Sequence, residues 1–79
     1  MRIDKYLKVS RLIKRRTVAN EAADCGRVVV NGKPVKASYN VKEGDIIEIA
    51  FGTKTLKARV LKLTESPKKD EAEEMYEIL

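Results

Sequence analysis

Residues 26–32 have the sequence Gly26-Arg27-Val28-Val29-Val30-Asn31-Gly32, in which a helix ends, a short strand follows and a tight turn comes next. A glycine after a helical run readily adopts the left-handed conformation that ends many helices. The three valines are β-branched and favour a strand, and Asn-Gly is the strongest short-range signal for a hairpin. The run therefore predicts a change from helix to sheet, with the return strand after Gly32.

The residues before this run predict two short helices. Between Arg2 and Ser10, apolar or small residues recur at helical spacing, at Ile3, Tyr6, Leu7 and Ser10. Thr17 is predicted to be the N-cap of a second helix with a narrow, alanine-rich apolar stripe, in which Cys25 fills core volume. Between the helices, Lys14-Arg15-Arg16 should form a basic corner in solvent.

The residues after Gly32 predict a small sheet and a last helix. We expect a return strand with Pro34 and Val35, a strand from Ile46 to Phe51, and another from Thr55 to Leu63. Tyr6 and Phe51 are expected in the core, whereas Tyr39 in a loop could be a nucleic-acid or partner contact. Helical spacing at Ala72, Met75, Tyr76 and Leu79 predicts a helix from Asp70 to Leu79.

The predicted class is α+β, with two packed N-terminal helices on a small, mostly antiparallel sheet of about four strands and a short C-terminal helix. We expect a domain over residues 1–65 and an acidic C-terminal helix over residues 66–79, packed on the same domain. A chain of 79 residues leaves no room for a second fold.

Composition disfavours catalysis. The chain has no histidine and one cysteine, which removes the usual zinc spacings and the imidazole base of most catalytic triads. We therefore expect no enzyme activity, no metal and no cofactor. A lone cysteine, the absence of a signal peptide after Met1 and the absence of a long apolar run predict a cytoplasmic protein without a membrane partner.

Charge is unevenly distributed along the chain. Residues 1–16 contain seven basic side chains and one acidic side chain, whereas residues 64–79 contain two basic and six acidic ones. A polyanion is attracted to the N-terminal end first. The candidate contacts, which we call the basic surface, are Arg2, Lys5, Lys8, Arg11, Lys14, Arg15, Arg16 and Thr17.

The basic corner before the second helix is a candidate anion-binding site. Free amides at the helix start and the guanidinium groups of Arg15 and Arg16 would converge on one anion, and phosphate fits such a site. Arginine also stacks on bases, which suits folded RNA. The alternative is that three consecutive charges form only a solvated turn.

Several motifs together resemble the RNA-binding domain first described in ribosomal protein S-four. They are Arg2-Ile3-Asp4 with Leu7, Arg16 at the start of a helix, Gly26-Arg27-Val28 with Val30-Asn31-Gly32, and Val41 with Gly44-Asp45 and Ile47. The resemblance covers roughly residues 1–50. It implies two helices packed side by side on a small sheet, with a basic face toward structured RNA.

Over nearly the whole chain, the segments Lys8–Thr17 and Met75–Leu79 resemble the RqcP family, also called YabO. The resemblance implies a bacterial factor of ribosome-associated quality control that binds an obstructed large ribosomal subunit. It implies contacts with large-subunit ribosomal RNA and P-site peptidyl-tRNA, support of alanine tailing by RqcH, and a monomer away from the ribosome. It assigns RNA contacts to Arg2, Lys8, Arg11, Arg15 and Arg16, and to Asp4 a role in orienting the basic groups or in capping.

Other functions remain open at this point. A general structured-RNA-binding protein, or a heat-shock factor that recycles ribosomal subunits, would carry the same surface. A DNA-binding regulator is a weaker alternative, because the second helix offers Asn20, Glu21 and Asp24 as its main polar groups, and two of these repel phosphate. A β-grasp sulfur carrier would end in Gly-Gly, which Ile78-Leu79 replaces here.

Overall fold

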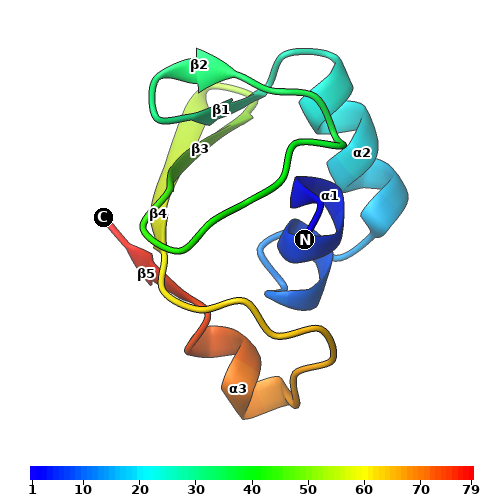
Figure 1. The fold of residues 1–79 in the computed structure, drawn as a ribbon. Coiled ribbons are helices and arrows are strands. Elements are labelled where there is room, and N and C mark those ends of the chain that lie inside the picture. Colours follow the sequence, from blue (N-terminus) through cyan, green and yellow to red (C-terminus); the bar gives the residue numbers. More distant parts are fainter.

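The computed structural model describes residues 1–79. Three helices and five strands follow one another as α1 (Ile3–Val9), α2 (Arg16–Asp24), β1 (Val28–Val30), β2 (Lys33–Pro34), β3 (Ile46–Phe51), β4 (Lys54–Val60), α3 (Lys69–Glu73) and β5 (Tyr76–Ile78) (Figure 1). The two N-terminal helices precede the sheet, as predicted. The α+β class is confirmed.

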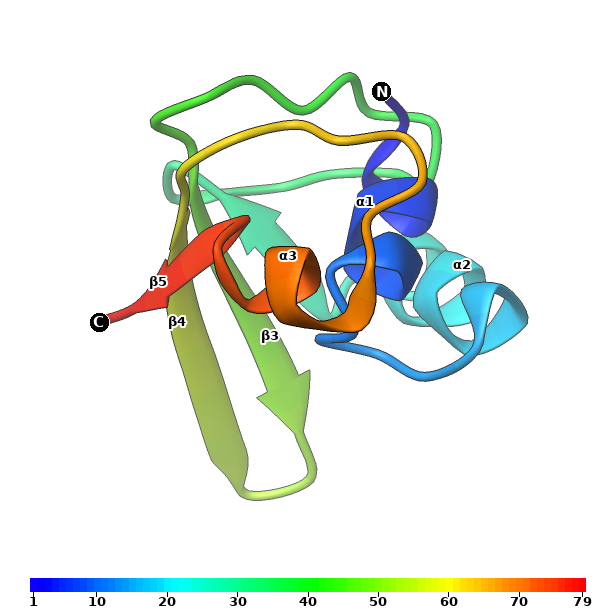
Figure 2. The ribbon, with the colours of Figure 1, turned by 90° about the horizontal axis from the view of Figure 1, so that it is seen from below.

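The sheet has the strand order β2-β1-β3-β4-β5, and every neighbouring pair is antiparallel. Helices α1 and α2 lie side by side and cover one face of it (Figure 2). The register places Val28 opposite Ile49, and Val30 opposite Ile47. Because opposite residues of a ladder share a face, these four side chains form one apolar row beneath the helices.

The core joins this row to the two helices. Ile3, Tyr6 and Leu7 of α1 are fully buried, and the small side chains of Ala19 and Ala23 let α2 approach closely. Burial of apolar side chains is the main force holding such a domain together. Since these residues come from both helices, burial fixes where the basic side chains on their exposed sides must lie.

The stretch that predicts the fold has the expected local structure. The N–H of Arg27 donates to the carbonyl of Ala22, and the N–H of Gly26 to that of Ala23, with Gly26 at φ +86°. This pair of bonds is a Schellman motif, which ends α2. Asn31 and Gly32 both have positive φ, as the turn of a tight hairpin requires.

The C-terminal segment differs from the prediction. In place of a helix from Asp70 to Leu79, α3 spans five residues, Lys69–Glu73, and β5 then pairs with β4 as a fifth strand. The carbonyl of Met75 anchors this change of structure, because it accepts from the Tyr6 hydroxyl and the Leu61 amide, each at 2.8 Å. Met75 itself is fully buried.

Smaller differences concern the ends of elements. Strand β4 ends at Val60 instead of Leu63, and Val35 lies just beyond β2. Phe51 continues the inward alternation of β3 but is 44% exposed. At this end β3 extends past the two helices (Figure 2). Cys25 is exposed as well, at the C-cap of α2. Neither side chain belongs to the core, contrary to the prediction.

None of the three helices has the length and apolar content needed to span a lipid bilayer.

Candidate nucleic-acid interface

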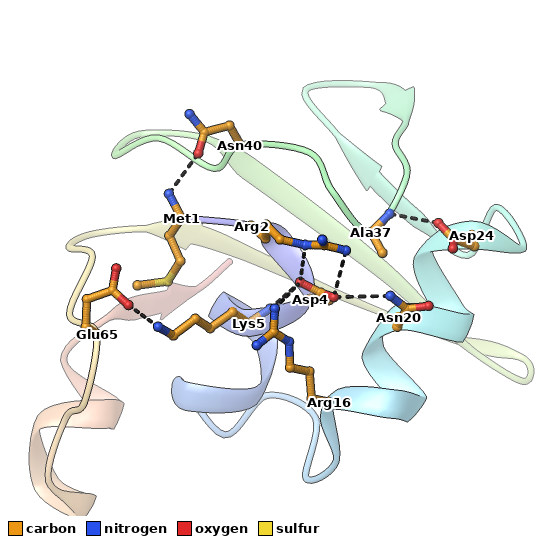
Figure 3. A network of polar contacts seen from close by, with 10 residues as sticks. All are labelled: Met1, Arg2, Asp4, Lys5, Arg16, Asn20, Asp24, Ala37, Asn40 and Glu65. Atoms are coloured by element: carbon orange, nitrogen blue, oxygen red, sulfur yellow. Dashed lines mark hydrogen bonds and ion pairs between the residues drawn. The ribbon is translucent and has the colours of Figure 1, made fainter.

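Asp4 is a buried carboxylate that orients two arginines of the basic surface, Arg2 and Arg16. It lies in the first turn of α1, and its side chain is only 3% exposed. It accepts from Nε and Nη2 of Arg2 at 3.2 and 3.3 Å, from Nη2 of Arg16 at 3.4 Å and from the Lys5 amide at 2.8 Å. A buried carboxylate with this many donors is fully satisfied. Figure 3 shows the arginines converging on it from two helices.

The pKa of Asp4 follows from these contacts. Burial by itself raises the pKa of a carboxyl group. Here the hydrogen bonds from Asn20, Arg16 and the Lys5 amide, together with the positive charge of Arg16, outweigh burial and lower the pKa of Asp4 below its usual 3.8. Asp4 is therefore a fixed negative charge at neutral pH, which suits a residue that orients guanidinium groups.

Arg2 and Arg16 form what we call the arginine pair. Arg2 is the N-cap residue of α1 and Arg16 is the first residue of α2, so the packing of the two helices brings them together. Their side chains are 51% and 48% exposed. Each guanidinium group has five donors in a planar fork. The pair thus keeps donors free for a phosphate while Asp4 fixes its orientation.

The start of α2 lies beside the arginine pair, but its cap is not the predicted one. Arg15, with extended backbone, is the N-cap, and no side chain caps the helix. Thr17 is in the first helical turn and exposed, where it lines a hollow of about 320 Å³ with Asp4, Arg16, Asn20 and Glu21. The amides of Arg16, Thr17 and Val18 have no partner within the protein. They remain available to an anion, as the basic-corner hypothesis requires.

A second group of basic residues lies at the other end of α1. Lys8, Arg11 and Lys14 line a cleft of about 500 Å³, whose opposite wall is formed by Glu65, Ser66 and Pro67. We call it the basic cleft. Arg11 has φ +66°, the left-handed conformation that glycine favours.

The predicted residues therefore separate into groups. The structure brings Arg2, Arg16 and Thr17 together over Asp4, and Lys8, Arg11 and Lys14 at the basic cleft. Lys5 is half-buried and forms an ion pair with Glu65. Arg15 is exposed and lines neither group.

Sequence reasoning gave Asn20 no part in this site. Its Nδ2 donates to Oδ2 of Asp4 at 3.2 Å. Asn20 follows Arg16 by four residues, so both lie on one face of α2, and that spacing was a usable signal. The same contact ties Asn20 to the fold. Asp24 likewise accepts from the Ala37 amide at 2.9 Å. Two of the three polar side chains of α2 are therefore engaged in contacts within the fold.

Tyr39, a candidate nucleic-acid or partner contact by its place in a loop, has a partner within the fold. Its hydroxyl donates to Oδ2 of Asp45 at 3.1 Å, and Asp45 also accepts from the Lys42 amide and from Asn31. Burial and the hydrogen bond to Asp45 raise the pKa of Tyr39. The ring therefore helps to order the connection between β2 and β3. The carbonyl of Tyr39 in turn accepts from the Ile3 amide at 2.8 Å, which supports the start of α1.

Comparisons with known proteins agree with this architecture. The S4 domain family model matches residues 1–47. The RQC P-site tRNA stabilizing factor of Listeria innocua is 58% identical over the whole chain, which covers 86% of that relative. The protein of the same name from Bacillus subtilis is 54% identical over the whole chain, which covers 92% of it.

A solved structure gives the same result for the fold. The trimeric structure of Vibrio cholerae Heat Shock Protein 15 superposes on the whole chain with a TM-score of 0.91 at 28% identity, over 81% of its own length. The resemblance noted in the sequence is thus confirmed. This chain belongs to the S4 domain family and, within it, to the family of RQC P-site tRNA stabilizing factors.

Proposed function

We propose that this chain binds structured RNA through the basic surface, without catalysing a reaction, and acts in ribosome-associated quality control. The observation that carries the proposal is the arginine pair, oriented by buried Asp4 next to the unpaired amides of α2. Guanidinium forks and helix-start amides are both strong donors to phosphate. The relatives' name supports tRNA in the P site as one RNA ligand.

The finer parts of the proposal concern the assembly. We propose that the chain contacts large-subunit ribosomal RNA and peptidyl-tRNA together, and so holds the tRNA while RqcH extends the stalled chain with alanine. Two separate groups of basic side chains, the arginine pair and the basic cleft, suit contact with two phosphate backbones at once. We also propose that residues 1–65 are the RNA-binding domain, that the chain is monomeric away from the ribosome, and that it functions in the cytoplasm.

Sedimentation with large ribosomal subunits tests the proposal. The tagged protein should co-sediment with subunits that retain peptidyl-tRNA, and binding should fall when the tRNA is released. Equal binding to both kinds of subunit would support a general RNA-binding protein and contradict the tRNA part. An absence of binding to either would contradict the proposal as a whole.

Arg16→Ala should weaken this binding about tenfold, the loss expected for one charge-assisted hydrogen bond. Arg59→Ala is the matched control. Arg59 carries the same charge and is 46% exposed, but it lies in β4 between the buried Ala58 and Val60 and so points to the sheet face opposite the helices. Equal weakening by both variants would indicate that net charge, and not the arginine pair, controls binding.

A further inference from the structure

The basic cleft is larger than a phosphate group requires. Its volume of about 500 Å³ lies within the range of roughly 300–1,000 Å³ that is usual for small-molecule sites. Lys8, Arg11 and Lys14 form one wall, and Val9 adds an apolar contact. The lining residues place the cleft between the end of α1 and the segment that leads to α3. These two parts of the backbone run close to each other in Figure 2. It is thus large enough for a whole nucleotide.

The charges in the cleft are of both signs. Glu65 faces the three basic residues from the opposite wall. Its ion pair with Lys5 lowers its pKa, through the hydrogen bond first and the charge of Lys5 second, so Glu65 is ionised at neutral pH. An ionised carboxylate only accepts hydrogen bonds and repels phosphate. A ligand that fits such a cleft carries both a phosphate and hydrogen-bond donors, as a nucleotide with its base does.

Arg11 occupies a position at which glycine is expected. It directly follows Ser10, the C-cap of α1, and its φ of +66° is strained for any residue with a Cβ atom. Strained residues of this kind cluster at ligand sites, where the side chain serves a purpose that glycine could not. The guanidinium plane of arginine both stacks on bases and binds phosphate.

We propose that the basic cleft takes up one unpaired nucleotide of the bound RNA. Its phosphate contacts Lys8 and Lys14, its base stacks on Arg11, and donors on the base face Glu65. This inference rests on the proposed function and adds a preference to it: the protein favours RNA with an extruded nucleotide over a continuous helix of the same charge. Recognition of unstacked bases is the usual basis of specificity for RNA.

Three matched RNA hairpins test this preference. One is fully paired, one carries a single 2-aminopurine bulge, and one carries an abasic site in place of that bulge. The bulged hairpin should bind about tenfold more tightly than the abasic one, as stacking of one base predicts, and 2-aminopurine fluorescence should change on binding. Salt-dependent binding with equal affinity for the bulged and the abasic hairpin would overturn this inference alone. No binding to any hairpin would overturn the proposed function as well.

Variants of the two walls distinguish binding in the cleft from binding by the rest of the basic surface. Arg11→Gly removes the stacking plane but suits the backbone, and it should bring the ratio of bulged to abasic affinity close to one. Glu65→Gln should lower that ratio too. Glu77→Gln is the control: it changes the net charge by the same amount, but Glu77 lies in β5, where it pairs with Arg59, and the ratio should stay as in wild type. An unchanged ratio in Arg11→Gly or Glu65→Gln would overturn the site.

Discussion

Single side chains decide how the basic surface presents its charge. Seven basic residues within sixteen positions predict an electrostatic attraction, but they do not predict its geometry. Asp4 supplies that geometry, since it draws Arg2 and Arg16 together from different helices. The sequence showed that an acid lies among the basic residues. It did not show that both arginines reach the same carboxylate, because this depends on how α1 packs against α2.

Asp4→Asn should destabilise the fold by about 1–3 kcal/mol at neutral pH, because the charge-assisted bonds to a buried carboxylate become weaker. The pKa of Asp4 is lowered in the folded state, so its contribution is complete at pH above the usual 3.8 and is lost as the pH falls through the folded value. Chemical denaturation at several pH values measures this. The stability difference between wild type and variant should be constant above about pH 5 and shrink in acid; a difference that does not depend on pH would contradict the role of the charge.

Arg11→Gly should affect stability and binding in opposite directions. Relief of the left-handed conformation should stabilise the fold by about 1 kcal/mol, while the loss of a cationic side chain should weaken RNA binding. Thermal unfolding and RNA titration of one preparation measure both. Lys14→Gly is the control, since Lys14 lines the same cleft but does not have the positive φ of Arg11. Destabilisation by Arg11→Gly would show that the arginine side chain itself supports the fold.

At the scale of elements, local signals explain part of the fold well. The Schellman motif at Gly26 and the turn at Asn31-Gly32 were predictable, because each depends on residues adjacent in sequence. The segment after Asp70 was not, since its helical spacing competes with pairing to a strand distant in sequence. As a strand, Tyr76–Ile78 forms a hydrogen-bonded ladder with β4. A short helix over the same residues would be only marginally stable by itself. The predicted N-cap of α2, Thr17, lies two positions after the observed one, Arg15, because the helix begins at Arg16 without a side-chain cap.

Tyr6→Phe tests how the last strand is attached. The Tyr6 hydroxyl is the only side-chain donor to the Met75 carbonyl, which also accepts from the Leu61 and Lys62 amides. Removal of the hydroxyl should cost about 1 kcal/mol. Hydrogen exchange should become faster in residues 74–79, with β1 and β3 protected as before. Uniformly faster exchange in all strands would instead indicate that β5 and the core unfold as one unit.

At the scale of the whole molecule, charge and shape together limit what the chain can bind. The chain has a net charge of +5, and this charge is unevenly distributed: the first sixteen residues have seven basic side chains and one acidic one, whereas the last sixteen have two basic and six acidic ones. Helices α1 and α2 pack on one face of the sheet (Figure 2). The exposed basic side chains of residues 1–16 therefore lie on that side of the molecule. A polyanion therefore encounters a surface with a preferred side.

Binding to ribosomal RNA should fall steeply with salt. If about four to six phosphates are contacted, the logarithm of the association constant should decrease with the logarithm of salt concentration with a slope of about −3 to −5. Fluorescence titration at several potassium concentrations measures the slope. Arg16→Ala should make it shallower by about one unit and Arg59→Ala should not. Affinity that is independent of salt would contradict phosphate binding altogether.

Folding, and not binding, immobilises the arginine pair. A long exposed side chain usually loses rotamer entropy when a ligand fixes it, at roughly 0.5–1.5 kcal/mol each. Arg2 and Arg16 are already restrained by Asp4 while half of each side chain remains in solvent. RNA thus meets a preorganised pair and loses less affinity to ordering than it would with two free arginines. A domain of 79 residues has few side chains available for any one contact. Preorganisation of this kind lets a small surface hold a large RNA.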